Sequence, residues 1–500
     1  TVRLVGNFSL PPADPARPGK AHSEQVLRSL QAQSRASQKE ILQFLHQPPV
    51  AAQVTDLTPF WIVNALSLSA SPSVIQELAA RTDVAAIELE PSYPAPSLAP
   101  AASAWDNLGK INAPQLWALG ARGQGVVVAS LDTGVDVTHP ELQSNWRGGN
   151  NSWYDPYGRH PTPVDSTSNC AAPGHGTGTM SIMVGQTTGV APGARWISAK
   201  IFDDTCLATL TGVLNSFQWL MDPDGDPTTA DAPQVVNSSW GGAGCDLSYQ
   251  QALIALRAAG ILPVFSAGNY GPNPGTGSFP GVYPQAFPVG ATDSADAIAS
   301  FSSRGPDTCG ARDVFPELVA PGVSIRMAYP GGQYVTASGT SFSAPHVAGT
   351  LALLISAFPQ PLTVAQQEDA LVNTAVDLAP TGPDDTYGYG RLDALAAYNW
   401  LRLHLLDAQL GFNLVSQTVN ETLPSVSLVV NRAGGVDFPV SVDLSVSGGT
   451  AVEGVNYAPL SVTRLDFASD ETQKVISLAL IYDPRPSLDK TLVLSLSNPQ

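Results

Sequence analysis

The sequence is poor in charge and in long apolar runs. Only 13% of its 500 residues are charged, and 24 basic residues against 42 acidic ones give a formal net charge of −18. This surplus of negative charge repels phosphate and anionic lipid, so we expect no nucleic-acid partner and no membrane-surface partner. No stretch of about 18 uninterrupted apolar residues is present, as a membrane span would require. At roughly 150 residues per domain, we expect a soluble chain of about three domains.

Cysteine is also scarce. The four cysteines are Cys170, Cys206, Cys245 and Cys309. The absence of a CxxC pair argues against a structural zinc site, whereas one or two disulfide bonds are allowed and their pairing stays open. The chain begins at Thr1 without a basic and then apolar leader, so a signal peptide has either been removed or never existed.

The first segment, residues 1–100, has mixed periodicity. The run AHSEQVLRSLQAQSRASQKEILQFLHQ has helical spacing, and FWIVNALSLSA, SPSVIQELAARTDV and AAIELE follow as strand, helix and strand. This order is typical of a small α+β unit. The stretch PSYPAPSLAPAAS closes the segment, and its Pro, Ala and Ser content predicts an exposed linker.

The two later segments differ in their strands. Residues 104–403 alternate continuous apolar strands, such as QGVVVASLD and ILPVFSAGN, with helices such as DLSYQQALIALRAAG. This pattern predicts an α/β domain with a parallel sheet covered on both faces. Residues 405–500 contain short alternating strands such as FPVSVDLSVSGG, which predict an all-β sandwich. The expected fold class is therefore multidomain.

One serine lies at the predicted start of a helix. In GTSFSAPHVAG, Ser341 lies among small residues, and the apolar run TLALLISAF follows. A helix that begins near Ser341 places Pro345 in its first turn, where a missing N–H costs little. The free amides and the dipole of such a helix favour an oxyanion in front of the serine. An ordinary N-cap serine is the alternative interpretation.

Three more polar residues lie at strand ends or a helix start of the same segment. Asp132 ends VVVASLD, His175 lies between glycines in GHGTGTMSIMVG, and Asn269 ends ILPVFSAGN. Each of them alone is more typical of a turn or loop than of an active site. Together with Ser341 they supply the nucleophile, base, orienting carboxylate and oxyanion donor that acyl transfer requires.

These motifs resemble those of the subtilase family of serine peptidases. DTGVDVTHP, GHGT, NSSWGG, FSAGN and GTSFSAPHVAG occur in the family's order, and WYD, GVAPGARWISAK and FSSRGP are similar to its bacillopeptidase F branch. The resemblance implies Ser341 as nucleophile, His175 as general base and then acid, and Asp132 as the residue that orients it. It also implies an oxyanion hole made by Asn269 and the backbone N–H of Ser341.

One stretch departs from the family pattern. The family usually continues HGT with His-Val-Ala, whereas Gly178, Thr179 and Met180 follow here. We therefore expect different packing beneath His175 and an unchanged base. The resemblance implies that the chemistry requires no cofactor.

The resemblance also implies a primary substrate pocket. Its residues would be Ser239, Trp240, Gly241, Gly242, Tyr270 and Ser278. The loop YGPNPGTGSFPG has no acidic residue to pair with a buried lysine or arginine side chain. This absence favours an apolar or aromatic residue before the scissile bond, and the alternative is a carboxylate that reaches in from another loop.

Both flanking segments resemble known domains. Residues 1–100 resemble the subtilase propeptide through WIVNALSLSASPSVIQELAARTDVAAIELEP, which implies a folding chaperone and intramolecular inhibitor. We expect its cleavage between Pro91 and Ala104. Residues 405–500 resemble a Calx-beta domain through NETLPSVSLVVNRAGG and TLVLSLSNP. They end before that family's final strands, so we expect a domain cut from a longer protein.

Two places raise the question of structural calcium. In the Calx-beta-like segment Glu421 and Asp483 match the family's ligands, but Asn456 replaces an aspartate and Pro484 stands where a second acid is common. A hard cation needs several charged oxygen ligands, so this set is incomplete. In MDPDGDPTTAD, the alternating residues Asp222, Asp224 and Asp226 resemble part of a calcium loop without its final glutamate. A solvated surface turn is the alternative.

The prediction is a secreted or cell-surface serine endopeptidase of bacterial type, made as a self-processing zymogen. Its partners would be protein or peptide substrates and its own propeptide. One alternative is a pseudo-enzyme or adhesion protein that binds partners through its β-sandwich, against which the intact set Asp132, His175, Asn269 and Ser341 argues. Another is an esterase of the same fold, which a comparison of peptide and ester substrates would separate.

Overall fold

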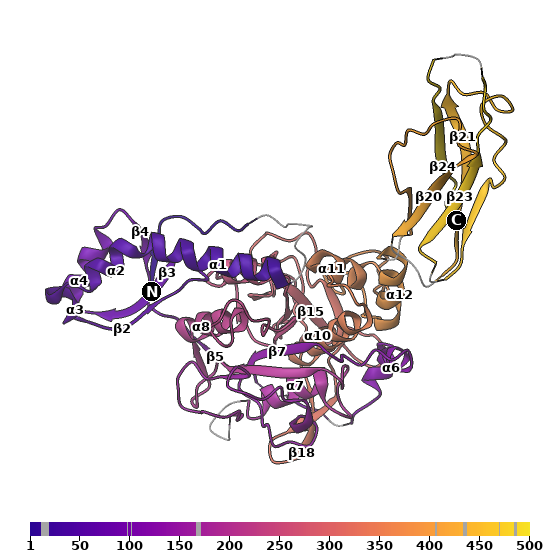
Figure 1. The fold of residues 1–500 in the computed structure, drawn as a ribbon. Coiled ribbons are helices and arrows are strands. Elements are labelled where there is room, and N and C mark those ends of the chain that lie inside the picture. The colour runs from indigo at the N-terminus through magenta and orange to yellow at the C-terminus, as the bar shows by residue number, and fades with distance from the viewer. Residues whose placement is uncertain are drawn as a thin grey trace. The chain divides into compact units, whose positions relative to one another are not determined.

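The computed structural model divides into two compact units, Thr1–Tyr398 and Asn399–Gln500 (Figure 1). It describes residues 1–11, 20–97, 99–101, 103–166, 172–405, 408–433, 438–469, 471–484 and 488–500. Among these residues, no helix has both the length and the apolar character needed to cross a membrane.

The described part of the first hundred residues forms a four-stranded antiparallel sheet and several helices. The strand order is β2-β3-β1-β4. The elements are β1 (Val2–Leu4), α1 (Lys20–Ser37), α2 (Lys39–Leu45), α3 (Pro48–Ala51), β2 (Val54–Pro59), β3 (Ala65–Ala70), α4 (Pro72–Ala79) and β4 (Val84–Ile87). The predicted long helix is interrupted at Gln38, whose buried amide donates to the Phe60 carbonyl oxygen at 2.7 Å.

The Pro-rich stretch that follows β4 is not an exposed linker, so this prediction was wrong. Strand β5 (Ser92–Pro94) pairs with β10 (Leu207–Thr209), and β6 (Ala99–Pro100) pairs with β18 (Gln333–Ser338), both antiparallel. Ala95 between them is 8% exposed. Local composition could not reveal this strand pairing, because the partner strands lie more than a hundred residues away in the sequence.

A seven-stranded parallel sheet forms the centre of the described part of the middle segment, as predicted. Its order is β16-β15-β13-β11-β7-β9-β8. The strands are β7 (Val127–Asp132), β8 (Trp153–Tyr154), β9 (Arg195–Lys200), β11 (Val235–Ser238), β13 (Leu262–Ser266), β15 (Phe287–Thr292) and β16 (Leu318–Pro321). From β7 the chain continues to β8 and β9 on one side and to β11 and later strands on the other. Residues at the carboxyl end of β7 therefore stand at the switch point where such sheets bind ligands.

Helices and short strands surround this sheet. The helices are α5 (Asn107–Lys110), α6 (Ala113–Ala118), α7 (His175–Val184), α8 (Leu210–Met221), α9 (Gln250–Ala258), α10 (Thr340–Ala357), α11 (Val364–Val372) and α12 (Ala394–His404), with a 3₁₀ turn at Gln143–Asn145. The remaining strands are β12 (Gly242–Ala243), β14 (Ser278–Phe279) and β17 (Ile325–Tyr329). Every residue of α7 is buried, as is α10 from Thr340 to Leu354. These two helices are part of the core on all sides.

The second unit contains two three-stranded antiparallel sheets in its described residues. One has the order β19-β20-β23 and the other β22-β21-β24. Their strands are β19 (Gln409–Phe412), β20 (Ser425–Ala433), β21 (Val440–Gly449), β22 (Arg464–Phe467), β23 (Gln473–Ala479) and β24 (Leu492–Ser497). Val430 and Ile476 from the first sheet pack with Val442, Leu444 and Phe467 from the second. The predicted β-sandwich is confirmed.

Candidate active site

Asp132 and His175 form a buried pair at the end of the central strand. Asp132 is the last residue of β7, His175 is the first residue of α7, and neither side chain is exposed. Nδ1 of His175 lies 2.7 Å from Oδ1 of Asp132. The carboxylate also accepts from the Thr133 N–H at 2.7 Å and from Oγ1 of Thr179 at 3.1 Å. A carboxylate held in this way favours the tautomer with its proton on Nδ1, so Nε2 becomes an acceptor.

Glycines on both sides of His175 allow its helix to approach the strand closely. Gly174 has a φ of +74°, a left-handed conformation that glycine adopts without strain. A Cβ atom added at Gly176 would lie 2.1 Å from the carbonyl oxygen of Gly134. Only small residues therefore fit on either side of His175.

The residues that depart from the family pattern lie in the same contact region. A Cβ atom added at Gly178 would lie 2.4 Å from Sδ of Met327, a residue of β17. This methionine occupies the space that a larger side chain would need. Thr179 contacts the Asp132 carboxylate, a contact that the sequence interpretation did not include. The packing beneath His175 thus uses a glycine and a methionine from a distant strand.

Helix α10 begins one residue before Ser341. Its N-cap is Gly339 and its first residue is Thr340, so Pro345 is the sixth residue of the helix and not part of the first turn. The prediction for this proline was wrong. A proline at this position removes the N–H that would donate to the Ser341 carbonyl oxygen. Oγ of Ser239 donates to that oxygen instead, at 2.8 Å.

The helices that carry Ser341 and His175 pack against each other, and no hydrogen bond joins the two side chains. Ser341 is 3% exposed, and its Oγ donates to the carbonyl oxygen of Ser239 at 3.3 Å. Nε2 of His175 is buried and has no hydrogen-bond partner among the residues that the structure describes. The ring of Phe342, the next residue of α10, has its centroid 5.7 Å from that of His175. The starts of α7 and α10 are therefore adjacent.

Asn269 is held by the residue that precedes Ser341. Its Oδ1 accepts from the backbone N–H and from Oγ1 of Thr340, both at 2.9 Å. Its amide nitrogen lies 3.6 Å from the position that a Cβ atom at Gly339 would take. Since the side-chain oxygen is already used, Asn269 presents its N–H donors in front of α10.

A second buried carboxylate links the segments that carry Asp132 and His175. Asp165 is 5% exposed. Its Oδ1 accepts from Oγ1 of Thr133 and its Oδ2 from the N–H of Thr177, both at 2.7 Å. Burial raises the pKa of Asp165 to about 6. Sequence reasoning missed these three residues, because the contacts join distant positions and no local pattern marks them.

Comparison with known proteins decides the family. Residues 123–390 match the subtilase family, and residues 407–500 match the Calx-beta domain. The chain belongs to the subtilase family. Bacillopeptidase F of Bacillus subtilis (strain 168) is 35% identical over 415 residues, which are 74% of this chain and 28% of that protein.

Shorter relatives are matched over most of their own length. Subtilisin E of Bacillus subtilis (strain 168) is 32% identical over 349 residues, which are 68% of this chain and 81% of that protein. A subtilisin of Bacillus pumilus is 34% identical over 298 residues, which are 58% of this chain and 97% of that protein. The chain therefore carries a subtilase serine endopeptidase domain, while it spans only 28% of the length of bacillopeptidase F.

Two of the pocket residues that the subtilase resemblance implies, Gly241 and Gly242, lie beside the strand that carries Ser278. Strand β12 pairs with β14, so Gly242 lies opposite Phe279. A Cβ atom added at Gly241 would lie 2.4 Å from Oγ of Ser278, and one added at Gly268 would lie 2.7 Å from its Cβ. Ser278 therefore stands where the segment after β11 and the segment after β13 approach each other. No carboxylate is among the nearest atoms at these described glycines.

The other pocket residues have different environments. The Trp240 side chain is 3% exposed and packs against Tyr249 and Phe265 in the core, so its backbone is the part available to a substrate. Ser239 is buried and bonded to the Ser341 backbone. Tyr270 is 48% exposed. Of these three side chains, that of Tyr270 is the exposed one.

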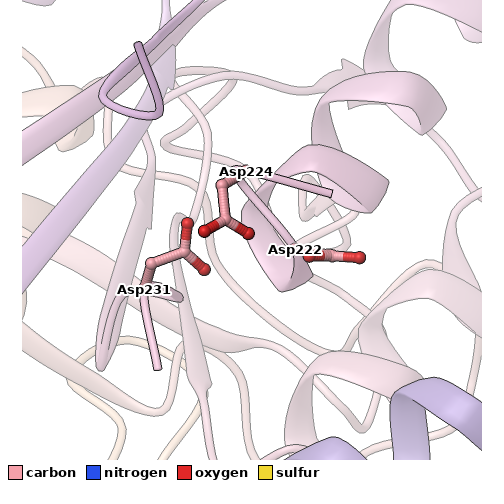
Figure 2. Close-up of side chains that lie close together, drawn as sticks. All are labelled: Asp222, Asp224 and Asp231. Atoms are coloured by element: carbon pink, nitrogen blue, oxygen red, sulfur yellow. The ribbon is translucent and has the colours of Figure 1, made fainter. Parts of the chain in front are cut away.

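Three aspartates lie close together away from the Asp132 pair. One carboxylate oxygen from each of Asp222, Asp224 and Asp231 lies within 4.8 Å of the others. Figure 2 shows the Asp224 and Asp231 carboxylates turned toward each other. Burial, followed by the charges of Asp231, Asp224 and Asp226, raises the pKa of Asp222. The sequence interpretation named Asp226 in place of Asp231, but the Asp226 carboxylate accepts from Thr228 and lies outside this group.

The second unit offers no comparable cluster in its described residues. Glu421 and Asp483 do not belong to a group of three or more candidate ligands there. Oδ1 of Asn456 accepts from the N–H of Val452 at 2.9 Å, so this side chain supports a turn. Pro484 offers no side-chain ligand.

One disulfide bond joins Cys245 to Cys309. It connects the residues just after β12 to a loop 64 positions later. Cys206 is disulfide-bonded as well. Cys170 lies outside the described residues. The pairing that the sequence left open is therefore settled for Cys245 and Cys309.

Proposed function

We propose that the subtilase domain hydrolyses peptide bonds through an acyl-enzyme intermediate. Ser341 would be the nucleophile, His175 the general base and then the general acid, and Asp132 the residue that orients the imidazole. The observation that carries this proposal is the buried 2.7 Å contact between Nδ1 of His175 and Oδ1 of Asp132, together with the unpartnered Nε2. A base held in one tautomer beside a serine is the arrangement that nucleophilic catalysis requires.

The serine hydroxyl would change its partner when substrate binds. In the free protein Oγ of Ser341 donates to the carbonyl oxygen of Ser239 at 3.3 Å, the weak end of the hydrogen-bond range. Nε2 of His175 is a stronger acceptor, and catalytic hydrogen bonds often form only in the substrate complex. We infer that a bound peptide turns the Ser341 hydroxyl toward His175.

The oxyanion of the tetrahedral intermediate would be bound by Asn269 and by the backbone N–H of Ser341. Thr340 holds the Asn269 side-chain oxygen, which leaves the amide nitrogen as the donor in front of α10. The N–H of Ser341 belongs to the first turn of α10, where amides lack helical partners. Because both donors are fixed before the reaction, they stabilise the developing charge without reorganisation.

Residues 1–100 would be a propeptide that inhibits this site. Its strands β5 and β6 pair with β10 and with β18, which leads directly into α10. The backbone of Ala95 donates to the Cys206 carbonyl oxygen at 2.9 Å. A peptide that adds a strand to an enzyme in this way occupies the place of a substrate. We propose that self-cleavage falls between Ala95 and Ala99, inside the expected range from Pro91 to Ala104.

An apolar contact would keep this propeptide bound after cleavage. Residues from α1 and from the loop before β3 share one buried cluster with residues from α8 and α9. The cluster includes Val26, Leu30, Phe60, Ile62, Leu214, Phe217, Leu253 and Leu256. Such an interface is not lost when one peptide bond is cut, so full activity would require degradation of the released segment.

The preferred residue before the scissile bond would be apolar or aromatic. Uncharged atoms of Ser278, Phe279 and Ser303 are the nearest neighbours of the pocket glycines, and a buried lysine or arginine would find no counter-ion among them. Ser278, which lies beside Gly241 and Gly268, would limit the size of that residue. An esterase activity would use the same groups, so both substrate types need to be assayed.

We further propose that the protein acts outside the cell. The Cys245–Cys309 disulfide is typical of proteins that fold in an oxidising compartment. Calcium would bind at Asp222, Asp224 and Asp231 and would stabilise the fold, whereas the chemistry itself would use only protein groups. The Calx-beta unit would bind other surfaces or position the peptidase.

Intact-mass analysis over time tests the central proposal. Wild type should lose about the first hundred residues, whereas Ser341→Ala should stay whole. A sulfonyl fluoride should add to wild type at Ser341 and not to the variant. If both proteins stay whole and the reagent fails to add to wild type, the peptidase proposal is wrong and a binding function of the β-sandwich becomes the leading hypothesis.

A further inference from the structure

Asp165 is a buried carboxylate that the proposed mechanism does not use. It lies in the loop between β8 and α7 and belongs to no helix or strand. Burial raises its pKa to about 6 from a usual value of 3.8. A buried carboxylate is costly unless polar partners compensate it, so its partners indicate its role.

One oxygen of Asp165 holds the residue that follows Asp132. Oδ1 accepts from Oγ1 of Thr133 at 2.7 Å and from the N–H of Ser166 at 2.7 Å. Lys200, on the neighbouring strand β9, donates from Nζ to the Thr133 carbonyl oxygen and to Oγ of Ser166, both at 2.8 Å. Thr133 is thereby fixed through both its side chain and its backbone.

The other oxygen of Asp165 holds the first turn of the helix that carries His175. Oδ2 accepts from the N–H of Thr177 at 2.7 Å and also from its Oγ1. The N–H of Gly176 donates to Oγ1 of Thr133 at 2.9 Å. Amides at a helix start have no partner within the helix, and negative charge is favourable there. Here Asp165 and the threonine that it holds supply those partners.

We propose that Asp165 is a positioning residue, which acts through Thr133 and Thr177 to set the separation of Asp132 and His175. This inference rests on the proposed catalytic function of that pair. Asp165 joins the end of β7 to the start of α7, and its hydrogen bonds reach the pair only through the two threonines. Without it, the helix start is free to move relative to the strand end, and the 2.7 Å contact between Nδ1 and Oδ1 lengthens.

The charged groups around Asp165 come from three elements. Asp132 ends β7, Lys200 lies on β9, and His175 begins α7. Protonation of Asp165 would remove an acceptor from Thr177 or Thr133 in acid. Rates are therefore measured at about pH 8, where the Asp165 carboxyl is ionised, so that its protonation does not contribute to the difference between wild type and the variants.

The test compares full-length variants, matured in the same way as wild type. Asp165→Asn keeps the side-chain shape, but its single carbonyl oxygen cannot accept hydrogen bonds from both Thr133 and Thr177 in the present geometry. Thr133→Val and Thr177→Val remove the hydroxyls at nearly constant volume, and Thr133→Ser and Thr177→Ser retain them. Because a misplacement of about 1 Å can cost on the order of 10²-fold in rate, we expect kcat to fall about 10- to 100-fold in Asp165→Asn and in the valine variants. KM should stay within about twofold, since no substrate contact is removed.

Controls separate this role from a loss of folding. Titration with a sulfonyl fluoride normalises each rate to the reactive enzyme, and the downfield proton signal of Nδ1–H in His175 should shift in Asp165→Asn. The serine variants should retain most of the wild-type rate. Thr350→Val removes another buried threonine hydroxyl on α10, one with no hydrogen-bond partner, and should change neither kcat nor KM.

The outcomes distinguish the two proposals. If wild type does not react with the sulfonyl fluoride, the proposed function fails and this inference falls with it. If wild type reacts but Asp165→Asn has the same normalised kcat, the positioning role alone is overturned. Equal losses in the serine and valine variants would overturn it as well, because the hydroxyls would then not carry the effect. If Asp165→Asn fails to fold, the comparison of the valine and serine variants at Thr133 and at Thr177 tests the positioning role instead.

Discussion

Oγ of Ser239 donates a hydrogen bond of 2.8 Å to the carbonyl oxygen of Ser341. This oxygen lacks its helical donor, because Pro345 has no N–H. Asn237, on β11, donates from Nδ2 to Oγ of Ser239 at 2.9 Å, so the hydroxyl hydrogen is directed at Ser341. The candidate nucleophile is therefore anchored to the sheet through its backbone.

Replacement of Ser239 by alanine leaves the buried Ser341 carbonyl without a donor. We expect the free energy of unfolding to fall by about 1 to 3 kcal/mol, measured by thermal denaturation in a Ser341→Ala background that prevents self-digestion. Pro345→Ala restores an N–H, so the double variant should be less destabilised than Ser239→Ala alone. Ser343→Ala is the control, because the buried Ser343 hydroxyl has no hydrogen-bond partner in the described part of the chain. Equal losses in the two serine variants would contradict this account.

Asn269→Ala should lower kcat by about 10²- to 10³-fold with little change in KM, since the lost contact exists only in the transition state. Thr340→Val removes one of the two hydrogen bonds to the Asn269 oxygen and keeps the other. The kcat of Thr340→Val should therefore fall less than that of Asn269→Ala. Steady-state kinetics on a peptide ester measure both variants, and an unchanged kcat in Asn269→Ala would remove this residue from the oxyanion hole.

The stability of the protein should depend on the ionisation of Asp165. Its folded-state pKa of about 6 lies above the usual 3.8, so its contribution to stability is full below the usual value and is lost as the pH rises through about 6. This difference corresponds to about 3 kcal/mol. Relative to Asp165→Asn, a protein with Asp165 should therefore lose stability between about pH 4 and pH 7. Denaturant unfolding in the Ser341→Ala background measures the free energy of unfolding at each pH. The prediction is refuted if this free energy changes with pH in the same way with Asp165 and with Asn at this position.

The group of Asp222, Asp224 and Asp231 should make stability sensitive to divalent cations. Burial and the neighbouring carboxylates raise the pKa of Asp222, so the ionised form of Asp222 opposes folding at neutral pH. Asp224→Asn should therefore raise the melting temperature in the presence of a chelator. Calcium should raise it in wild type and not in this variant. Asp226→Asn, outside the group, should keep the response to calcium; a response unchanged by Asp224→Asn would argue against a cation at these residues.

Much of the fold could be predicted from periodicity. The apolar strands that end in Asp132 and near Asn269 are buried on both faces, and this burial gives continuous apolar runs in the sequence. The glycines beside His175 were informative for a similar reason, since the close approach to Gly134 is a steric requirement that local sequence records.

The errors and omissions have one physical cause, which is pairing between distant segments. Proline composition predicted a linker around Ala95, but backbone hydrogen bonds to Cys206 order it. Pro345 was assigned to the first helical turn because nothing local revealed that Ser239 supplies the missing donor. Asp165 was missed because its partners Thr133 and Thr177 lie on either side of it in the chain and meet it only after folding.

The complete burial of α7 and of most of α10 has a consequence for evolution and engineering. Substitution of a buried residue in these helices alters the core, so the proposed catalytic residues His175 and Ser341 lie in a part of the protein that tolerates little variation. The segment 271–276 after Tyr270 lies in a loop and is exposed or half-buried, so it can vary more freely, whereas Ser278 is buried. New substrate preferences should therefore arise by exchange of this loop, while the reaction itself stays unchanged.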